Sequence, residues 1–292
     1  MKNFKKLALM GLTAVMSLSL LAACGGGNSG SAETPSGNTE TPSVENTETP
    51  AASGEFTTVE AGKLIMSTNA QFPPYEMVGD GEGYEGTGYE GIDVEIAYAI
   101  AQKLGLELVV DNMGFDAALQ AVQTGKSDIV MAGVTVTDDR LEVMDFSDTY
   151  ANGIQVVIVP ENSDIATIDD LEGKLIGCQM GTTGYIYCSD TPENGGYGED
   201  AVIPYDDGAA AIQALMNGQV DCVVIDNAPA QEYVKANPGL KILDTEFANE
   251  NYAIGFAKGN TALKDAVNTA LNELIEDGTV QSIIDKYIPA EG

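Results

Sequence analysis

Short apolar runs alternate with amphipathic runs from about residue 60 to the end of the chain. Residues 63–68 and 128–134 are apolar runs typical of buried strands, whereas residues 92–104 and 115–124 repeat apolar side chains at helical spacing. This alternation predicts an α/β fold in which helices cover a largely parallel sheet.

The same alternation restarts after residue 150, which suggests a second module. Two β-α modules in one chain predict two lobes with a cleft between them, and ligands of open α/β sheets bind outside the carboxyl ends of the strands. The strands expected in this half are 154–159, 174–178, 220–225 and 252–257, and the helices are 209–217, 261–276 and 279–287.

The first residues of the chain are typical of a targeting segment. Three lysines precede the uncharged apolar stretch 7–22, and Leu21-Ala22-Ala23-Cys24 resembles a bacterial lipobox. The resemblance implies cleavage after residue 23, lipidation of Cys24 and attachment to a membrane surface. An ordinary signal peptide with an incidental cysteine is the alternative. A transmembrane anchor is not expected, because the apolar stretch is short of the ~20 residues that span a bilayer.

Composition restricts what the chain can bind. It has 13 Lys and Arg against 45 Asp and Glu, a net charge of −32, and no His. A protein with this large negative charge repels a phosphate backbone. No nucleic acid is therefore expected as a partner. Without His, the usual Ser-His-Asp and Cys-His systems are absent. Residues 24–59 form a polar tether, and Cys178, Cys188 and Cys222 are expected to form no disulfide.

The single arginine follows a strand. Thr137 is expected to cap a helix whose first turn contains Arg140, where the helix dipole disfavours a cation. A guanidinium there can bind a carboxylate through two parallel hydrogen bonds. The alternative is a surface arginine paired with Asp139 or Glu142.

Three further groups follow other predicted strands. The run 179–184 can present backbone N–H groups to an anion, Asp226 can accept an ammonium group, and Phe72 and Phe115 can form an apolar wall. Ordinary helix capping explains the first two equally well. Together, however, these groups are what an α-amino acid requires.

These segments match one family in order along residues 60–290. The chain resembles the polar-amino-acid substrate-binding proteins of ABC importers, solute-binding family 3. The matching runs are Phe72–Glu76, Gly91–Ala97, Gly133–Arg140, Phe146–Asp148, Gly181–Thr183, Val224–Asn227 and Gly278–Thr279.

The resemblance implies a type II periplasmic-binding-protein-like fold with two crossing hinge strands. Lobe 1 would comprise residues 60–151 plus 252–292 and lobe 2 residues 152–251. Arg140, Thr135 and Thr183 would bind the ligand carboxylate, and Asp226 and Gly133 the ammonium group. The ligand side chain would contact Asn69, Phe72, Phe115 and Glu76.

Two features depart from the family pattern. Members that bind basic amino acids often have an Asp at the position of Asn69, so its absence favours neutral ligands such as glutamine or cystine, although Glu76 could partly substitute for that charge. The loop Gly79–Gly91 is long and is expected to be a solvated surface insertion.

The resemblance implies a non-enzymatic, monomeric lipoprotein that delivers a polar neutral or basic L-amino acid to an ABC permease, without cofactor or metal. Two alternatives are a dehydratase-like cleft enzyme on the same fold and an amino-acid sensor lipoprotein. The first would need an acid-base pair, for which Glu76 is the only candidate.

Overall fold

The computed structural model describes residues 56–289. The predicted signal peptide 1–23, Cys24 and most of the tether lie outside the described residues. Within residues 56–289, no helix is long and apolar enough to cross a membrane.

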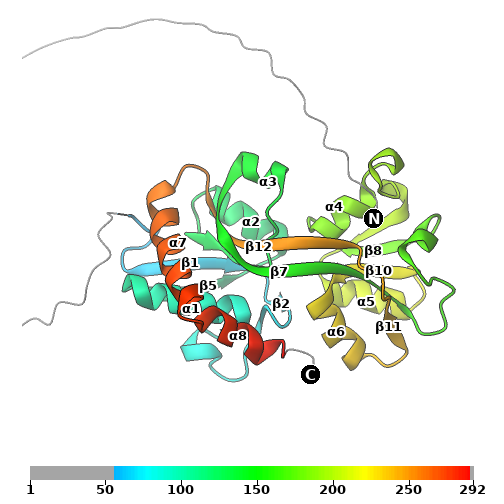
Figure 1. The fold of residues 1–292 in the computed structure, drawn as a ribbon, viewed down its shortest axis with the longest axis horizontal. Coiled ribbons are helices and arrows are strands. Elements are labelled where there is room, and N and C mark those ends of the chain that lie inside the picture. Colours follow the sequence, from blue (N-terminus) through cyan, green and yellow to red (C-terminus); the bar gives the residue numbers. More distant parts are fainter. Residues whose placement is uncertain (1–55, 290–292) are drawn as a thin grey trace, which may run out of the picture. The chain divides into compact units, whose positions relative to one another are not determined.

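One sheet of nine strands passes through the described part of the chain (Figure 1). Its main path runs β5 (Glu107–Asn112), β1 (Lys63–Thr68), β6 (Ile129–Val130), β12 (Ala248–Ala257), β7 (Met144–Pro160), β10 (Cys222–Asp226), β8 (Ile176–Gln179) and β9 (Val202–Tyr205), and β11 (Leu240–Ile242) pairs with β7.

The sheet is mixed rather than largely parallel. β1 pairs in parallel with β5 and β6, and β8 pairs in parallel with β10 and β9. Between these two parallel groups lie the long strands β7 and β12, which pair antiparallel with each other. The expectation of a largely parallel sheet therefore holds within each group and fails at the centre, where β7 is far longer than the expected strand 154–159.

The segments expected to cross between the lobes pair with each other. Glu250 is opposite Gly153 and Tyr252 is opposite Ala151, with register shifts just beyond Tyr252. In Figure 1, β7 (green) and β12 (orange) run across the centre and join the two groups of elements.

Helices cover the sheet close to where the sequence predicts them. α1 begins at Ile92 and ends at Leu104 because Gly105 adopts a left-handed φ of 70°, a conformation that terminates helices. The helices are α1 (Ile92–Leu104), α2 (Phe115–Gln123), α3 (Asp138–Val143), α4 (Thr183–Ser189), α5 (Gly208–Met216), α6 (Asn227–Ala236), α7 (Thr261–Glu276) and α8 (Thr279–Tyr287). Short 3-10 helices span Tyr84–Gly86, Ile168–Leu171, Pro192–Asn194 and Glu199–Ala201.

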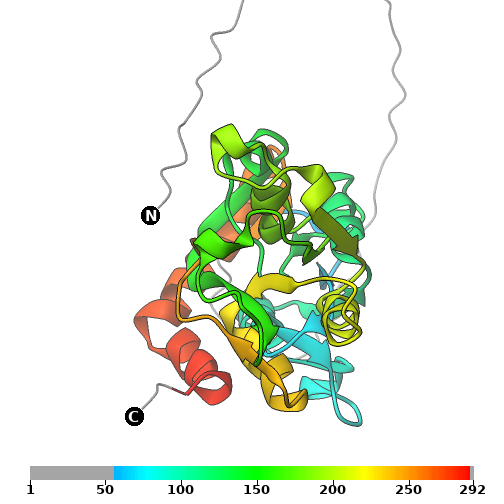
Figure 2. The ribbon, with the colours of Figure 1, turned by 90° about the vertical axis from the view of Figure 1, so that its right-hand side faces the viewer.

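The side chains form separate apolar cores on either side of the β7–β12 pair. One side, which we call the first lobe, contains β1, α1, α2 and α7, and the other, the second lobe, contains β8, β10 and α5. Figure 2 shows α7 and α8, coloured orange to red, on the outer side of the first lobe. The three cysteines of the second lobe are buried and free, as expected.

The loop Gly79–Gly91 is more structured than expected. A small sheet of β2 (Gln71–Phe72), β3 (Glu76–Val78) and β4 (Tyr89–Glu90) frames it. Tyr84 and Tyr89 pack against the core of the first lobe, and the ring of Tyr84 lies edge-on to Tyr98 at 5.4 Å. A purely solvated insertion was therefore the wrong interpretation, because its aromatic side chains bury apolar surface.

Candidate functional site

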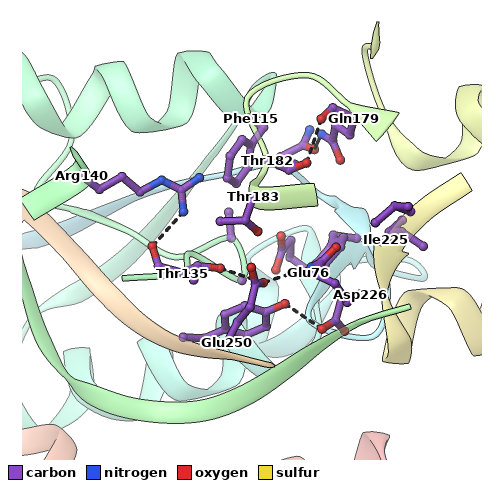
Figure 3. A pocket seen from close by; sticks show the side chains of 17 residues that line it. Glu76, Phe115, Thr135, Arg140, Gln179, Thr182, Thr183, Ile225, Asp226 and Glu250 are labelled. Atoms are coloured by element: carbon purple, nitrogen blue, oxygen red, sulfur yellow. Dashed lines mark hydrogen bonds between the residues drawn. The ribbon is translucent and has the colours of Figure 1, made fainter. Parts of the chain in front are cut away.

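A pocket lies between the two lobes at the ends of the strands (Figure 3). All nine residues that the sequence predicts for the ligand line it, namely Asn69, Phe72, Glu76, Phe115, Gly133, Thr135, Arg140, Thr183 and Asp226. Cys24 lies outside the described residues.

Eight further residues line the same pocket. Gln179 and Thr182 belong to the run 179–184 that the sequence indicated. Most of the others lie on the crossing strands or on β10, where short apolar runs and isolated polar residues do not distinguish a site from a core. They are Ala132, Gln155, Gln179, Thr182, Val224, Ile225, Glu250 and Tyr252.

Arg140 is held at one end of the pocket. Its backbone N–H donates to the hydroxyl of Thr137, which caps α3 as predicted. The guanidinium donates from Nη1 to the carbonyl of Thr135 at 2.8 Å and from Nη2 to the carbonyl of Gly181 at 3.2 Å. A guanidinium has five N–H donors, so donors remain for an anion in the pocket.

Phe115 fixes the guanidinium from another side. The Cζ atom of Arg140 lies 5.5 Å from the centre of the Phe115 ring, within range of a cation–π contact. Only 8% of Arg140 is exposed, and this burial lowers its pKa from the ordinary value. The surface ion pair with Asp139 or Glu142 is absent from the ion pairs of residues 56–289.

The N-terminus of α4 meets the pocket on the second lobe. Thr182 caps this helix by accepting from the N–H of Tyr185, and Thr183 is the first helical residue. The first N–H groups of a helix have no partner within it and attract anions. Arg140 and this helix start therefore present positive potential from opposite lobes.

Asp226 lies on the opposite side of the pocket from Arg140, at the end of β10 (Figure 3). One oxygen accepts from the N–H of Ala228 and thereby caps α6, while the other accepts from Ile154 N–H and from the hydroxyl of Tyr252 at 2.8 Å. Burial raises the pKa of Asp226 to about 6 despite these donors. Capping and pocket lining are thus both performed by one carboxylate.

Glu250 is a pocket acid that sequence reasoning missed. Its Oε2 atom accepts from the hydroxyl of Thr135 and from the amide of Gln155, both at 3.0 Å. Thr135 was predicted to bind the ligand carboxylate, and the structure shows its hydroxyl already bonded to this side chain. Nothing in the local pattern of β12 identifies Glu250, because its burial follows from the pairing of β12 with β7.

Asn69 joins the lobes across the pocket. Its Oδ1 atom accepts from Nε2 of Gln179 at 3.0 Å, and its amide donates to the carbonyl of Met113 at 2.9 Å. With both polar atoms bonded, Asn69 contributes to the contact between the lobes besides lining the pocket.

Aromatic rings form one wall. The rings of Phe72 and Tyr75 stack at 5.6 Å, and Tyr75 meets Tyr252 edge-on at 5.3 Å. Gly133 approaches Phe72 so closely that a β-carbon would lie 2.8 Å from the ring, and its φ of +54° also favours glycine.

Glu76 lies deep in the pocket and is fully buried. Neither carboxyl oxygen accepts a hydrogen bond from a donor among the described residues. Burial, followed by the negative charge of Asp93, raises the pKa of Glu76 well above its ordinary value. The ionisable side chains that line the pocket are therefore one guanidinium and the three acids Glu76, Asp226 and Glu250.

Comparison with known proteins agrees with this geometry. The family described as bacterial extracellular solute-binding proteins, family 3, matches residues 64–290. The chain belongs to this family. Because family 3 proteins bind solutes, the chain is a solute-binding protein rather than an enzyme, as the sequence predicted.

Two relatives are similar to this chain over most of its length. The chain is 34% identical over 236 residues to a probable histidine-binding protein of Neisseria gonorrhoeae, covering 79% of this chain and 85% of the relative. It is 32% identical to the L-cystine-binding protein TcyJ of Escherichia coli (strain K12), covering 80% of this chain and 85% of TcyJ.

Solved structures confirm the two-lobed periplasmic-binding-protein-like fold. One of them is the arginine-, lysine-, histidine-binding protein ArtJ of the thermophilic bacterium Geobacillus stearothermophilus. It is 33% identical with a TM-score of 0.70, and the alignment covers 79% of this chain and 96% of ArtJ.

Proposed function

We propose that this family 3 protein captures a polar L-amino acid between its lobes and delivers it to an ABC permease outside the cytoplasm. The observation that carries the proposal is the placement of Arg140 and Asp226 at opposite sides of one pocket. In the proposed arrangement the zwitterion lies between them, with its carboxylate at Arg140 and the start of α4 and its ammonium group at Asp226.

The proposed ligand contacts involve both lobes. Arg140 and Thr135 come from the first lobe, while Thr183 and Asp226 come from the second. Because the ligand bridges the lobes, its binding favours the closed arrangement, which is the form a permease can recognise. We place the lobe boundaries at residues 60–151 plus 252–292 and 152–251.

The remaining polar groups restrict the ligand side chain. Asn69, Phe72, Phe115 and Glu76 also line this pocket, and we assign them to the ligand side chain. Related proteins are named for histidine, cystine, arginine and lysine, which include both cationic and neutral side chains. We therefore propose a polar neutral or basic amino acid as the ligand, and a monomer anchored through a lipid on Cys24 as its carrier.

A thermal-shift screen of the standard amino acids with cystine and ornithine tests the proposal. A ligand at 100 times its dissociation constant stabilises the folded state by ~2.7 kcal/mol, which raises the melting temperature measurably. A screen in which no amino acid shifts the melting temperature contradicts the proposal.

Substitution of Arg140 tests the assigned carboxylate contact. Arg140→Ala is expected to cost at least ~2 kcal/mol of binding free energy, or about 30-fold in affinity, because a charged hydrogen-bonded partner is lost. Arg140→Lys keeps the positive charge but lacks the planar guanidinium group, so its affinity should lie between those of the wild type and Arg140→Ala. Calorimetry that finds near wild-type affinity in Arg140→Ala would refute the assignment.

A further inference from the structure

The carboxyl group of Glu76 faces a second buried acid. Asp93, on α1, is also fully buried and interacts electrostatically with Glu76. The oxygens of Asp93 accept from the hydroxyl of Tyr150 at 2.7 Å and from the N–H of Gly133 at 3.0 Å. Asp93 is thus stabilised as a carboxylate by two neutral donors, whereas Glu76 has no donor among the described residues.

The groups around Glu76 contribute no positive charge. Asp93 faces it from α1, Tyr150 from β7 and Tyr75 from its own loop, while Asp226 and Tyr252 line the same pocket from β10 and β12. The one base that lines the pocket, Arg140, is bonded to carbonyl groups at the opposite end. Two adjacent carboxyl groups in such surroundings cannot both be ionised without a large cost, and they share one proton.

We propose that Glu76 holds a proton when the pocket is empty, and that a cationic ligand side chain displaces this proton to solvent. A neutral side chain leaves the proton in place, shared between Glu76 and Asp93. The step conserves charge, since one positive charge enters the pocket as one proton leaves. The inference rests on the proposed function and adds to it that solution pH sets the preference between basic and neutral amino acids.

Asp226 provides an internal reference for this proton. Its pKa is raised to about 6 by burial, and its proposed partner is the ammonium group that every amino acid carries. Proton release at Asp226 therefore accompanies the binding of either kind of ligand. The difference between a basic and a neutral ligand isolates the proton on Glu76.

Calorimetry of the full chain with L-arginine and with L-glutamine tests the proposal. Titrations from about pH 6 to about pH 8, in buffers with different ionisation enthalpies, report the protons released. Arginine should release up to about one proton more than glutamine. Its affinity relative to glutamine should rise by up to about tenfold per pH unit while Glu76 is protonated in the empty protein.

Glu76→Gln is the informative variant, because its amide can donate to Asp93 as a protonated carboxyl group does. In this variant, arginine should release no more protons than glutamine, and the affinity for arginine relative to glutamine should no longer change with pH. The substitution should lower the affinity for arginine at least about tenfold more than the affinity for glutamine. Asp80→Asn removes an exposed acid from the loop after β3 and should keep the wild-type difference.

Equal proton release with both ligands, or an arginine-specific release that persists in Glu76→Gln, overturns the inference. Binding of neutral amino acids alone also overturns it while leaving the proposed function intact. If no amino acid binds at any pH, the proposed function itself fails.

Discussion

At the scale of single residues, the pocket combines one base with several buried acids. Asp93 accepts two hydrogen bonds and Asp226 accepts three, which favour the ionised form of each carboxyl group. Burial nevertheless raises the pKa of both to about 6. A carboxyl group in this state costs free energy when ionised, and at Asp226 the proposed ammonium group of the ligand would compensate for that cost.

These raised pKa values predict how the stability of the ligand-free chain depends on pH. The folded chain binds protons at Asp93 and Asp226 below about pH 6, whereas the unfolded chain binds them only near ~4. The free energy of unfolding should therefore rise as pH falls from about 7.5 to about 5, by at least ~1–3 kcal/mol, because the raised pKa of Glu76 acts in the same direction.

Urea unfolding at the two pH values measures this change. High salt in both samples screens the repulsion among surface acids, which would otherwise contribute in the same direction. A stability that is constant, or that rises with pH over this range, contradicts the prediction.

At the scale of elements, short helices at strand ends position the charged groups. Thr137 caps α3 and thereby orients Arg140, and Thr182 caps α4 beside Thr183. Capping chemistry and ligand chemistry use the same few residues, which explains why local patterns alone left both interpretations open.

Thr137→Ala should therefore affect stability and binding together. Loss of the cap is expected to cost ~1 kcal/mol of unfolding free energy, and the freed start of α3 should weaken amino-acid binding at Arg140. Asp207→Ala removes a comparable cap from α5, which contributes no residue to the pocket. This control should lose stability without losing affinity. Equal losses of affinity in the two variants would contradict a specific role of the α3 cap in ligand binding.

At the scale of the whole described molecule, the structure is a closed arrangement of two lobes. Besides the contacts made by the crossing strands, hydrogen bonds join the lobes from Arg140 to Gly181, from Gln179 to Asn69 and from Tyr233 to Gln71. The approach is close at Gly181, where a β-carbon would lie 1.8 Å from an oxygen of Asp116.

Gly181→Ala should hinder closure. The added methyl group meets the exposed carboxyl group of Asp116 only when the lobes are together, and this side chain must turn aside, so affinity for the amino acid is expected to fall about two- to fivefold, or ~0.5–1 kcal/mol. Small-angle scattering should show less ligand-induced compaction than in the wild type. Gly173→Ala is the matched control, because Gly173 has a φ of +76° close to the +77° of Gly181 and has open space around it. Unchanged affinity in Gly181→Ala would contradict the role of closure.

Local sequence sufficed for the order of elements and for much of the site. The helices 92–104, 261–276 and 279–287 follow from the periodicity of their apolar residues and are present with those bounds. The strand-end residues Arg140, Thr183 and Asp226 were found because such positions meet at one edge of a parallel sheet, and all three line the pocket.

Tertiary structure alone decided the environment of the remaining groups. Thr135 and Glu250 are separated by 115 residues in the sequence, and their contact exists because β12 pairs with β7. The antiparallel centre of the sheet and the buried pair of Glu76 and Asp93 likewise exist because separate elements of the chain pack against each other. Burial and pairing depend on which distant segments meet, and hence the sequence by itself determined which chemical groups are present, while the fold determined which of them are charged and which are free to bind.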